Sequence, residues 1–467
     1  MNRTFVRALA LTAVVALAAC QGGGMNGSAI PAAPGAPVTQ DAPQPSSAAP
    51  ADESDAHAAQ DAALPTGTGV SVAGDGEIPI ASADAIHRVC APVRQPGEKT
   101  CFAIERRDLR VNRLGQNVSH QGYGPSDLTS AYNISGARSS LVAIVDAYGY
   151  PQASSDLAKY RAFYGLPACT TGNQCLKLRN QTGGTNLPKA DQGWDSEQAL
   201  DLDMVSAMCP KCKILLVESN SNFTSDLYAA ASEAAKLGAA VISNSYGGSE
   251  SAQCGGGGEQ SDPAFSAPGH VFVASSGDQG GGLKNCGGPQ QPCSLATVVC
   301  VGGTLLVHGH TQRGWKESVW NELSNYSCTG SCGGAGSGCS TIVKKPAWQT
   351  DPTCKMRSEA DVSAEASVLT PVAVYFGGYG GWTAFGGTSV STPLVAGIFG
   401  RAGNGGSGNG PRNLWTNRSH LNDLTVGNNL YAPLSGNCAS SAHYICYAGK
   451  GFDGPTGLGS PNGLAAF

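Results

Sequence analysis

A serine and a pair of acids in this 467-residue chain have the types and spacing that nucleophilic catalysis needs. Ser389 lies in the stretch Phe385–Pro393, where two glycines precede it and an apolar run follows. Glycine permits tight turns, and we expect a helix to open at Pro393 with Ser391 or Thr392 as its cap. A serine at a helix start lies near backbone N–H groups that could receive an oxyanion. A capped helix after a glycine turn has the same pattern, so the test is whether the chain supplies a base.

Glu197 and Asp201 are the best candidates for that base. They are spaced i, i+4 in a predicted helix, Trp194–Met208, so they share one helix face at about 5–6 Å. Two close carboxylates resist losing both protons, so one titrates high and can act as an acid or a base. A solvated acidic face would have the same spacing, but apolar residues flank these acids: Trp194, Ala199, Leu200, Leu202, Met204 and Val205.

A histidine base, as in a Ser-His-Asp peptidase of the subtilisin type, is an alternative. Asp146 ends the apolar run Ser140–Asp146 and is a plausible acid for such a site. His308 and His310 offer two imidazoles, but both follow a predicted strand and precede a polar turn. That position is typical of an exposed hairpin tip.

The elements that must position these residues form an alternating series. Apolar runs predict strands at 140–146, 213–217, 239–244, 270–275 and 298–301, and helical patterns fall at 154–164, 194–208 and 225–237. This alternation predicts an α/β fold, a doubly wound and mostly parallel sheet flanked by helices, with the chemistry at the carboxyl ends of strands. Turns and cysteines dominate from about 311 to 381, where we expect covering loops with short elements at 360–364 and 372–376.

Three motifs occur in the order Glu197-x-x-x-Asp201, Ser-Ser-Gly-Asp278-x-Gly and Gly-Thr-Ser389-x-Ser-x-Pro. In this order they resemble the sedolisins, or serine-carboxyl peptidases, which share the subtilisin fold. The resemblance covers about Gly122–Phe467. It implies that Ser389 is the nucleophile, that Glu197 is the general base and acid, and that Asp201 holds Glu197 and shares its proton.

The resemblance implies two further features of the site. Asp278 looks like the acid of the oxyanion hole, which must be protonated to donate a hydrogen bond. The stretch Ser243–Gly248 resembles the strand edge along which such enzymes dock an extended substrate. A carboxylic base and a protonated donor work best in acid, so we expect activity at acidic pH that is lost toward neutrality.

Acids and glycine turns near the C-terminus suit one structural Ca²⁺ ion, which takes hard oxygen ligands. The layout resembles the sedolisin calcium site, which implies side-chain ligands from Asp423 and Asp453. Backbone carbonyls would come from Leu424, Gly449 and Gly451. Glycine turns with Asp are also common without a metal.

Residues 1–19 predict export. Arg3 and Arg7 precede an apolar run that is too short to span a bilayer, which is typical of a signal peptide. The run ends in Leu-Ala-Ala before Cys20 and resembles the lipobox of bacterial lipoproteins, so Cys20 is expected to carry a lipid that anchors the protein to the membrane. An ordinary signal peptide, with release outside the cell, is the alternative. We expect the protein at the bacterial envelope or cell surface, or free in the medium.

Composition divides the rest of the chain. Residues 20–83 are mostly Ala, Pro, Gly and Ser and predict a disordered tether, which follows the anchor. Residues 84–121 are expected to be an N-terminal extension that packs on a peptidase domain at 122–467. Sedolisins are commonly made with a large folded propeptide, and this extension is too short to be one.

Sixteen of the 17 cysteines remain when Cys20 is set aside, and an even number in an exported protein indicates disulfides. Cys209-Pro210-Lys211-Cys212 could also be a redox or zinc motif, but no second pair completes a zinc site, so a structural staple is favoured. Nearest neighbours suggest the pairs Cys90/Cys101, Cys169/Cys175, Cys209/Cys212, Cys254/Cys286, Cys293/Cys300, Cys328/Cys332, Cys339/Cys354 and Cys438/Cys446.

Charge excludes one class of partner. Charged residues make up 13% of the chain, the net charge is −5 and there is no basic stripe, so nucleic-acid binding has no electrostatic support. The sequence therefore favours a monomeric, lipid-anchored endopeptidase acting on proteins or peptides. A lipoprotein that uses a peptidase fold to bind peptides or a partner without cleaving them is the alternative. The presence of Ser389, Glu197, Asp201 and Asp278 together argues against it.

Overall fold

The computed structural model describes residues 69–72, 76–79, 83–109, 122–136, 138–251, 257–281, 288–323, 332–352, 354–403, 409–430, 438 and 440–467. All of them belong to one unit of the chain, Glu53–Phe467. The predicted signal peptide, Cys20 and most of the predicted tether lie outside these residues. Within the described stretches, no helix has both the length and the apolar character needed to cross a bilayer.

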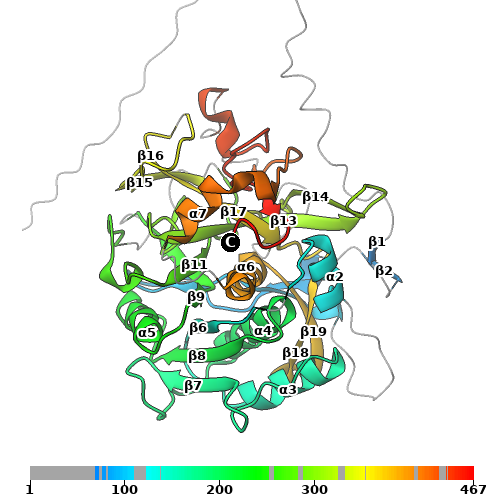
Figure 1. Ribbon diagram of the computed structural model, residues 1–467, viewed down its shortest axis with the longest axis vertical. Helices are drawn as coiled ribbons and strands as arrows, with labels where there is room; N and C mark the ends of the chain where they lie inside the picture. The colour runs from blue at the N-terminus through cyan, green and yellow to red at the C-terminus, as the bar shows by residue number, and fades with distance from the viewer. Residues whose placement is uncertain are drawn as a thin grey trace, which may run out of the picture. The chain divides into compact units, whose positions relative to one another are not determined.

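A central eight-stranded sheet supports the site (Figure 1). Its strands lie in the order β14-β13-β11-β9-β6-β8-β7, with β17 also paired to β13, and the neighbours are parallel except β13 and β14. Its inner strands are almost wholly buried, as expected for a parallel sheet covered on both faces. The predicted mostly parallel α/β fold is therefore confirmed. The strands are β6 (Leu141–Ala147), β7 (Leu176–Asn180), β8 (Lys213–Ser219), β9 (Val241–Asn244), β11 (Val271–Ser275), β13 (Val298–His308), β14 (Trp315–Val319) and β17 (Val362–Glu365).

Helices cover both faces of this sheet. Figure 1 shows α4 and α6 side by side, with α5 on the other side of the strands. The α-helices are α2 (Pro125–Ala131), α3 (Ala153–Phe163), α4 (Gln192–Met208), α5 (Thr224–Lys236), α6 (Thr388–Ala402) and α7 (Gly410–Thr416).

Helix α4 is buried along nearly its whole length. Asp191 caps it, because its side chain accepts hydrogen bonds from the backbone N–H groups of Gly193 and Trp194. From Trp194 to Met208 every residue except Asp195 is buried, since α4 packs against α6 as well as against α3 and β6. The carboxyl groups of Glu197, Asp201 and Asp203 on this helix therefore have no side that faces water.

Helix α6 begins at Thr388, so the prediction that a helix opens at Pro393 was wrong. Pro393 lies inside the helix, where it removes one intrahelical hydrogen bond. Ser391 and Thr392 do not cap the helix; their hydroxyls donate to the carbonyl of Thr388. The helix can start early because Asp278 accepts a hydrogen bond from the Thr388 N–H, which serves as the cap that the local sequence lacks.

The segment before the predicted peptidase domain adds strands to two smaller sheets. Strands β3 (Ile86–Arg88) and β5 (Ile104–Arg106) belong to the sheet β18-β19-β5-β3, and β4 (Thr100–Cys101) belongs to the sheet β12-β10-β4. Residues 84–109 are thus woven into the fold, while the boundaries drawn at 84 and 122 stay predictions. The partner strands are β10 (Tyr246–Ser249), β12 (Gln290–Gln291), β18 (Val372–Phe376) and β19 (Gly381–Gly386).

The stretch from 311 to 381 contains more strands than the sequence indicated, because glycines and cysteines hide the alternation there. In addition to β14, β17, β18 and β19, it holds β15 (Gly338–Lys344) paired with β16 (Met356–Glu359). The other short elements are β1 (Gly69–Val72), β2 (Gly76–Pro79), β20 (Leu421–Asn422), β21 (Ser460–Pro461), η1 (Ala83–Ala85), η2 (Arg107–Leu109), η4 (Pro263–Phe265), η5 (Gly377–Tyr379), η7 (Arg418–His420) and η9 (Ser440–Ile445).

Disulfides close short loops around the fold. Six predicted pairs are present: Cys90–Cys101, Cys169–Cys175, Cys209–Cys212, Cys293–Cys300, Cys339–Cys354 and Cys438–Cys446. The Cys-x-x-Cys motif is therefore oxidised and follows α4 as a staple. Cys332 is also disulfide-bonded. Cys254, Cys286 and Cys328 lie outside the described residues, so the two remaining pairs stay predictions.

Candidate active site

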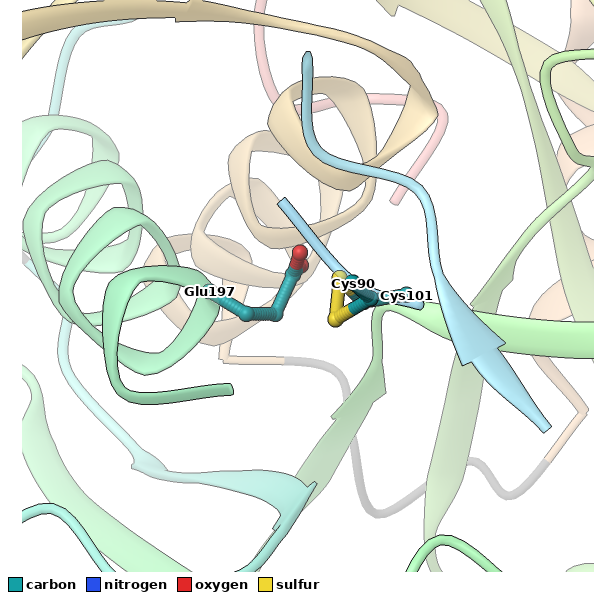
Figure 2. A group of neighbouring side chains, drawn as sticks. All are labelled: Cys90, Cys101 and Glu197. Atoms are coloured by element: carbon teal, nitrogen blue, oxygen red, sulfur yellow. A yellow bond between two sulfur atoms is a disulfide. The ribbon is translucent and has the colours of Figure 1, made fainter. Parts of the chain in front are cut away.

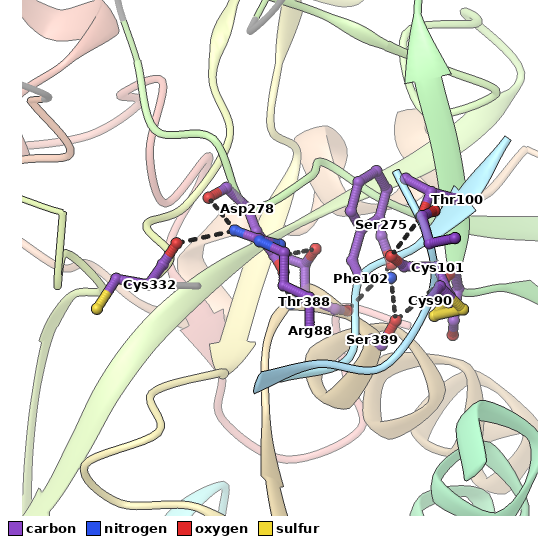
Figure 3. A network of polar contacts seen from close by, with 12 residues as sticks. Arg88, Cys90, Thr100, Cys101, Phe102, Ser275, Asp278, Cys332, Thr388 and Ser389 are labelled. Atoms are coloured by element: carbon purple, nitrogen blue, oxygen red, sulfur yellow. Dashed lines mark hydrogen bonds and ion pairs between the residues drawn. A yellow bond between two sulfur atoms is a disulfide. The ribbon is translucent and has the colours of Figure 1, made fainter. Parts of the chain in front are cut away.

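Ser389 is the second residue of α6 and is completely buried. Gly387 precedes the helix with φ +95°, a conformation that glycine adopts readily. The space beside Gly387 is also full, because a Cβ there would lie 1.8 Å from the carbonyl oxygen of Phe102. The Ser389 hydroxyl donates a hydrogen bond of 3.0 Å to the carbonyl oxygen of Ser245. It accepts another of 3.0 Å from the N–H of Phe102 (Figure 3).

Glu197 and Asp201 lie one turn apart on α4, and both are completely buried. Burial raises the pKa of Glu197 well above its usual range, and the nearby Asp201 raises it further. The Ser389 hydroxyl lowers the pKa of Glu197, so the acid and the hydroxyl are neighbours. Within the described residues, neither Glu197 oxygen makes a hydrogen bond of ordinary geometry, because Ser389 is engaged with Ser245 and Phe102.

Asp201 is held by Ser245, which lies between β9 and β10. Its Oδ1 accepts a hydrogen bond of 2.8 Å from the hydroxyl of Ser245. Burial raises the pKa of Asp201 well above its usual range, while the Ser245 hydrogen bond lowers it. Ser245 therefore links Asp201 to Ser389, since its hydroxyl donates to the Asp201 carboxyl group and its carbonyl oxygen accepts from the Ser389 hydroxyl.

Asp278 follows β11 and contacts Thr388, the residue before Ser389. Its Oδ1 accepts hydrogen bonds from the backbone N–H and the hydroxyl of Thr388, at 2.9 and 2.8 Å. Its Oδ2 lies 3.1 Å from the guanidinium of Arg88. Burial raises the pKa of Asp278, and the Arg88 cation opposes that rise. Asp278 also raises the pKa of Glu197, so the structure brings all four predicted catalytic residues into one buried cluster.

Asp146 extends this cluster beyond the four predicted residues. It lies near the end of β6, is completely buried, and neither of its oxygens is hydrogen-bonded to a described residue. Burial raises its pKa well above the usual range, and Asp201 and Glu197 add to the rise. The sequence placed Asp146 only in the alternative site with a histidine, yet its neighbours are carboxyl groups.

Of the two candidate histidines, His308 is the last residue of β13 and His310 follows the strand. The ring of His308 stacks on Trp315 with their centroids 3.7 Å apart. In the part of the chain that the structure describes, no hydrogen bond joins His308 or His310 to Ser389, whose hydroxyl is bound to Ser245 and Phe102. The geometry therefore favours a carboxyl base over an imidazole.

The N-terminal segment supplies residues that the sequence did not suggest. The Cys90–Cys101 disulfide faces the carboxyl group of Glu197 (Figure 2). Phe102 contacts Ser389, and Arg88 contacts Asp278 (Figure 3). No sequence motif indicates these contacts, because Phe102 makes its contact through a backbone N–H and Arg88 pairs with an acid 190 residues away.

The predicted calcium ligands gather in the C-terminal loops. The N–H of Gly451 donates to both oxygens of Asp423, at 3.1 and 3.0 Å, and the N–H of Gly449 donates to Asp453 Oδ2 at 3.1 Å. Burial raises the pKa of Asp453 to about 8, and the Asp423 charge adds to the rise. Among the described residues, nothing donates to the carbonyl oxygens of Leu424, Gly449 and Gly451. Two acids and three free carbonyls fit a hard cation.

Comparison with known proteins agrees with this arrangement. The model of the subtilase family matches residues 183–425, just over half of the chain, and this region includes Glu197, Asp201, Asp278 and Ser389. Kumamolisin of Bacillus sp. (strain MN-32) is 28% identical over 86% of this chain and 73% of its own length. Sedolisin of Pseudomonas sp. (strain 101) is 27% identical over 73% of this chain and 60% of its own length.

A solved structure resembles the fold as a whole. It is Pseudomonas sedolisin, a serine-carboxyl proteinase, complexed with two molecules of pseudo-iodotyrostatin. The TM-score is 0.60 at 26% identity, and the match covers 74% of this chain and 96% of that one. The similarity therefore extends over most of the described residues.

Proposed function

The chain belongs to the subtilase family and is a serine-type peptidase, and we propose that it is a serine-carboxyl endopeptidase that cleaves proteins or peptides in acid. The observation that carries this proposal is the buried carboxyl group of Glu197 beside the Ser389 hydroxyl. A carboxylate in this position can take the hydroxyl proton as Ser389 attacks a substrate carbonyl.

The acid pair provides the base. Glu197 and Asp201 lie one turn apart in a site without water-exposed surface. Two such acids lose their protons in separate steps, and between these steps the pair holds one proton and one negative charge. When Ser389 attacks, Glu197 accepts its proton and Asp201 shares it. When the acyl-enzyme forms, the same proton passes from Glu197 to the leaving amine. Ser245 positions Asp201 through its hydroxyl.

Asp278 and the start of α6 provide the oxyanion site. The negative oxygen of the tetrahedral intermediate needs donors placed before the reaction starts. Asp278 donates only when it is protonated, and burial raises its pKa in that direction. Strand β10 follows Ser245 and supplies backbone groups on which an extended substrate can pair.

A structural Ca²⁺ ion would be held by the side chains of Asp423 and Asp453 and the carbonyl groups of Leu424, Gly449 and Gly451. The cation would stabilise the loops by neutralising two neighbouring acids, one of them buried. It takes no part in the proposed proton transfers.

Export and lipid attachment are part of the same proposal. The sequence 1–19 supports a signal peptide, and Cys20 supports lipid attachment after its removal. The protein would then act as a monomer at the bacterial envelope, tethered by residues 20–83, or be released into the medium.

Digestion of casein at pH 4 tests the proposed function. The wild-type protein is expected to cleave casein, and Ser389→Ala is expected to reduce the rate by at least about 10³-fold. Ser391→Ala is the matched control and should leave the rate nearly unchanged, because among the described residues the Ser391 hydroxyl bonds only to the Thr388 carbonyl of its own helix. Equal cleavage by wild type and Ser389→Ala would contradict the proposal. No cleavage by the wild type would favour a binding lipoprotein.

A further inference from the structure

A group of aromatic side chains lies on the surface where α3 packs beside β18 and the neighbouring strand β19 (Figure 1). We call its members, Phe163, Tyr164, Tyr375 and Trp382, the aromatic patch. Among the described residues, two large hydrophobic side chains are exposed, Phe163 at 52% and Leu237 at 37%. The other three members of the patch are partly buried. The patch includes none of the residues of the proposed active site.

The helix and the two strands hold the rings of the patch in place. Tyr375 and Trp382 are directly opposite each other in the antiparallel pair of β18 and β19. The centroid of the Trp382 ring lies 4.6 Å from that of Phe163 and 5.7 Å from that of Tyr164. Tyr160, which is completely buried, supports Trp382 at 5.9 Å. Because the rings are already packed together, little side-chain entropy would be lost when a partner covers them.

A cation borders the aromatic patch. Lys159 lies one turn before Phe163 on α3 and is exposed. Its Nζ donates a hydrogen bond of 3.1 Å to Tyr375 Oη and lies 4.8 Å from the centroid of that ring. The other charged side chains of α3, Asp156 and Arg161, are buried. The charge that α3 presents beside the patch is therefore positive.

Two kinds of partner fit the shape and size of the patch poorly. Sugars stack on flat, exposed ring faces, but the rings of Phe163, Tyr164 and Tyr375 stand at 60°, 87° and 87° to that of Trp382. Such edge-to-face packing gives a ridge and not a flat platform. A second copy of the chain would need about 800 Å² of surface on each partner. One exposed phenylalanine and three partly buried rings do not supply that area.

The surface of a lipid bilayer fits the patch better. Trp and Tyr rings concentrate at the headgroup level of membranes, and a lysine there is attracted to anionic headgroups. An apolar side chain that protrudes among such rings can enter the boundary of the acyl chains. The proposed lipid on Cys20 would keep the domain beside a membrane, so a weak contact would be occupied for much of the time.

We propose that the aromatic patch docks on a phospholipid surface. Phe163 enters the outer part of the acyl layer, Trp382 lies at the headgroup level, and Lys159 lies beside a phosphate. The proposal takes its membrane from the envelope location proposed above and is independent of the catalytic residues. A lipid at one end of the tether and a second contact on the domain would hold the peptidase in one orientation.

Sedimentation with vesicles tests the contact. The protein is the mature chain, residues 20–467, with Cys20→Ala so that no lipid is attached, and the vesicles hold equal parts of phosphatidylcholine and phosphatidylglycerol. Phe163→Ser should lower the partition coefficient at least about fourfold, because half of a phenylalanine side chain no longer leaves water. Leu237→Ser removes the other exposed apolar side chain, at the C-terminal end of α5, and should leave the partition coefficient unchanged. Lys159→Gln should weaken binding to these vesicles and not to vesicles of phosphatidylcholine alone.

Tryptophan fluorescence locates the contact on the molecule. Brominated phospholipids should quench the fluorescence of the Cys20→Ala chain, and adding Trp382→Phe should remove most of that quenching. Equal sedimentation with and without Phe163→Ser, or equal quenching with and without Trp382→Phe, would overturn the proposal. A dimer that depends on Phe163 and does not bind vesicles would also overturn it and would assign the patch to a second copy of the chain.

Two further measurements separate this inference from the proposed function. Casein digestion in solution should proceed at the same rate with and without Phe163→Ser. Casein cleavage without vesicle binding overturns the membrane contact and leaves the peptidase function intact, while vesicle binding through Phe163 without casein cleavage does the reverse. If mass spectrometry of the exported wild type finds no lipid on Cys20, and the Cys20→Ala chain still binds vesicles through Phe163, the proposed anchor fails and the patch stands.

Discussion

Arg88 Nη1 lies 3.1 Å from Asp278 Oδ2, and this ion pair joins the N-terminal segment to the acid of the proposed oxyanion site. Other groups also face Asp278, namely the N–H and hydroxyl of Thr388 and the carboxyl group of Glu197. The Arg88 cation favours the charged form of Asp278, which cannot donate a hydrogen bond. The ion pair therefore holds the N-terminal segment against the site. It also disfavours the protonated form of Asp278 that the proposed reaction needs.

Arg88→Gln should keep the enzyme active at higher pH than the wild type. Without the cation the pKa of Asp278 rises, so its protonated, donating form persists as the pH increases. The measurement is the rate of casein digestion at a series of pH values. Arg94→Gln is the control, because Arg94 is an exposed arginine of the same segment. Identical pH profiles for wild type and Arg88→Gln would contradict the assignment.

Asp201→Asn should lower kcat/KM by about 10²-fold, since Glu197 loses the group that shares its proton and fixes its position. The pKa of Glu197 should fall as well, because Asp201 raises it. The part of the pH profile that reports Glu197 should therefore move to lower pH. Asp195→Asn changes an acid on the same helix that is not among those acting on Glu197, and it should leave the profile in place.

Glu218→Gln should flatten the pH dependence of stability. Burial raises the pKa of Glu218 to about 7, so the native protein binds a proton that the unfolded chain releases near 4.5. The native state therefore loses stability as the pH rises from 4.5 to 7, by about 3 kcal/mol for this group. Glutamine does not titrate, so that loss should disappear in urea unfolding at the two pH values. Glu233→Gln, at the Lys236 ion pair on α5, should keep it.

Removal of calcium should lower the melting temperature. A free ion concentration 100 times the dissociation constant stabilises the native state by about 2.7 kcal/mol, which is worth several degrees in a domain of this kind. Thermal melts in excess chelator and after calcium is restored measure the effect. Asp453→Asn should melt alike in both conditions. An unchanged melt of the wild type in chelator would argue against the site.

The sequence predicted the sheet, and singled out four residues that the structure brings into one buried cluster, because their signals are local. Glu197 and Asp201 are one turn apart on a helix bounded by apolar residues, and Asp278 and Ser389 each follow a glycine turn. These spacings lie within one helix or one turn, so they do not depend on which other elements pack against them. The six short disulfide loops were predicted for the same reason.

The parts that the sequence missed depend on contacts between distant residues. Helix α6 starts at Thr388 because Asp278, 110 residues earlier, binds its first N–H. Phe102 and Ser389 are 287 residues apart, and the segment around Phe102 has too few apolar residues to predict a packed element. Asp146 joins the acid cluster only because β6 lies beside α4.

The pH profile of kcat/KM tests most directly whether a carboxyl group is the base for Ser389. Cleavage of a peptide that contains one of the bonds cut in casein is followed from pH 3 to pH 9. We predict the highest values in acid and a steady loss toward neutrality, as Asp278 gives up its proton. A maximum above pH 8 would contradict a glutamate base and a protonated oxyanion donor.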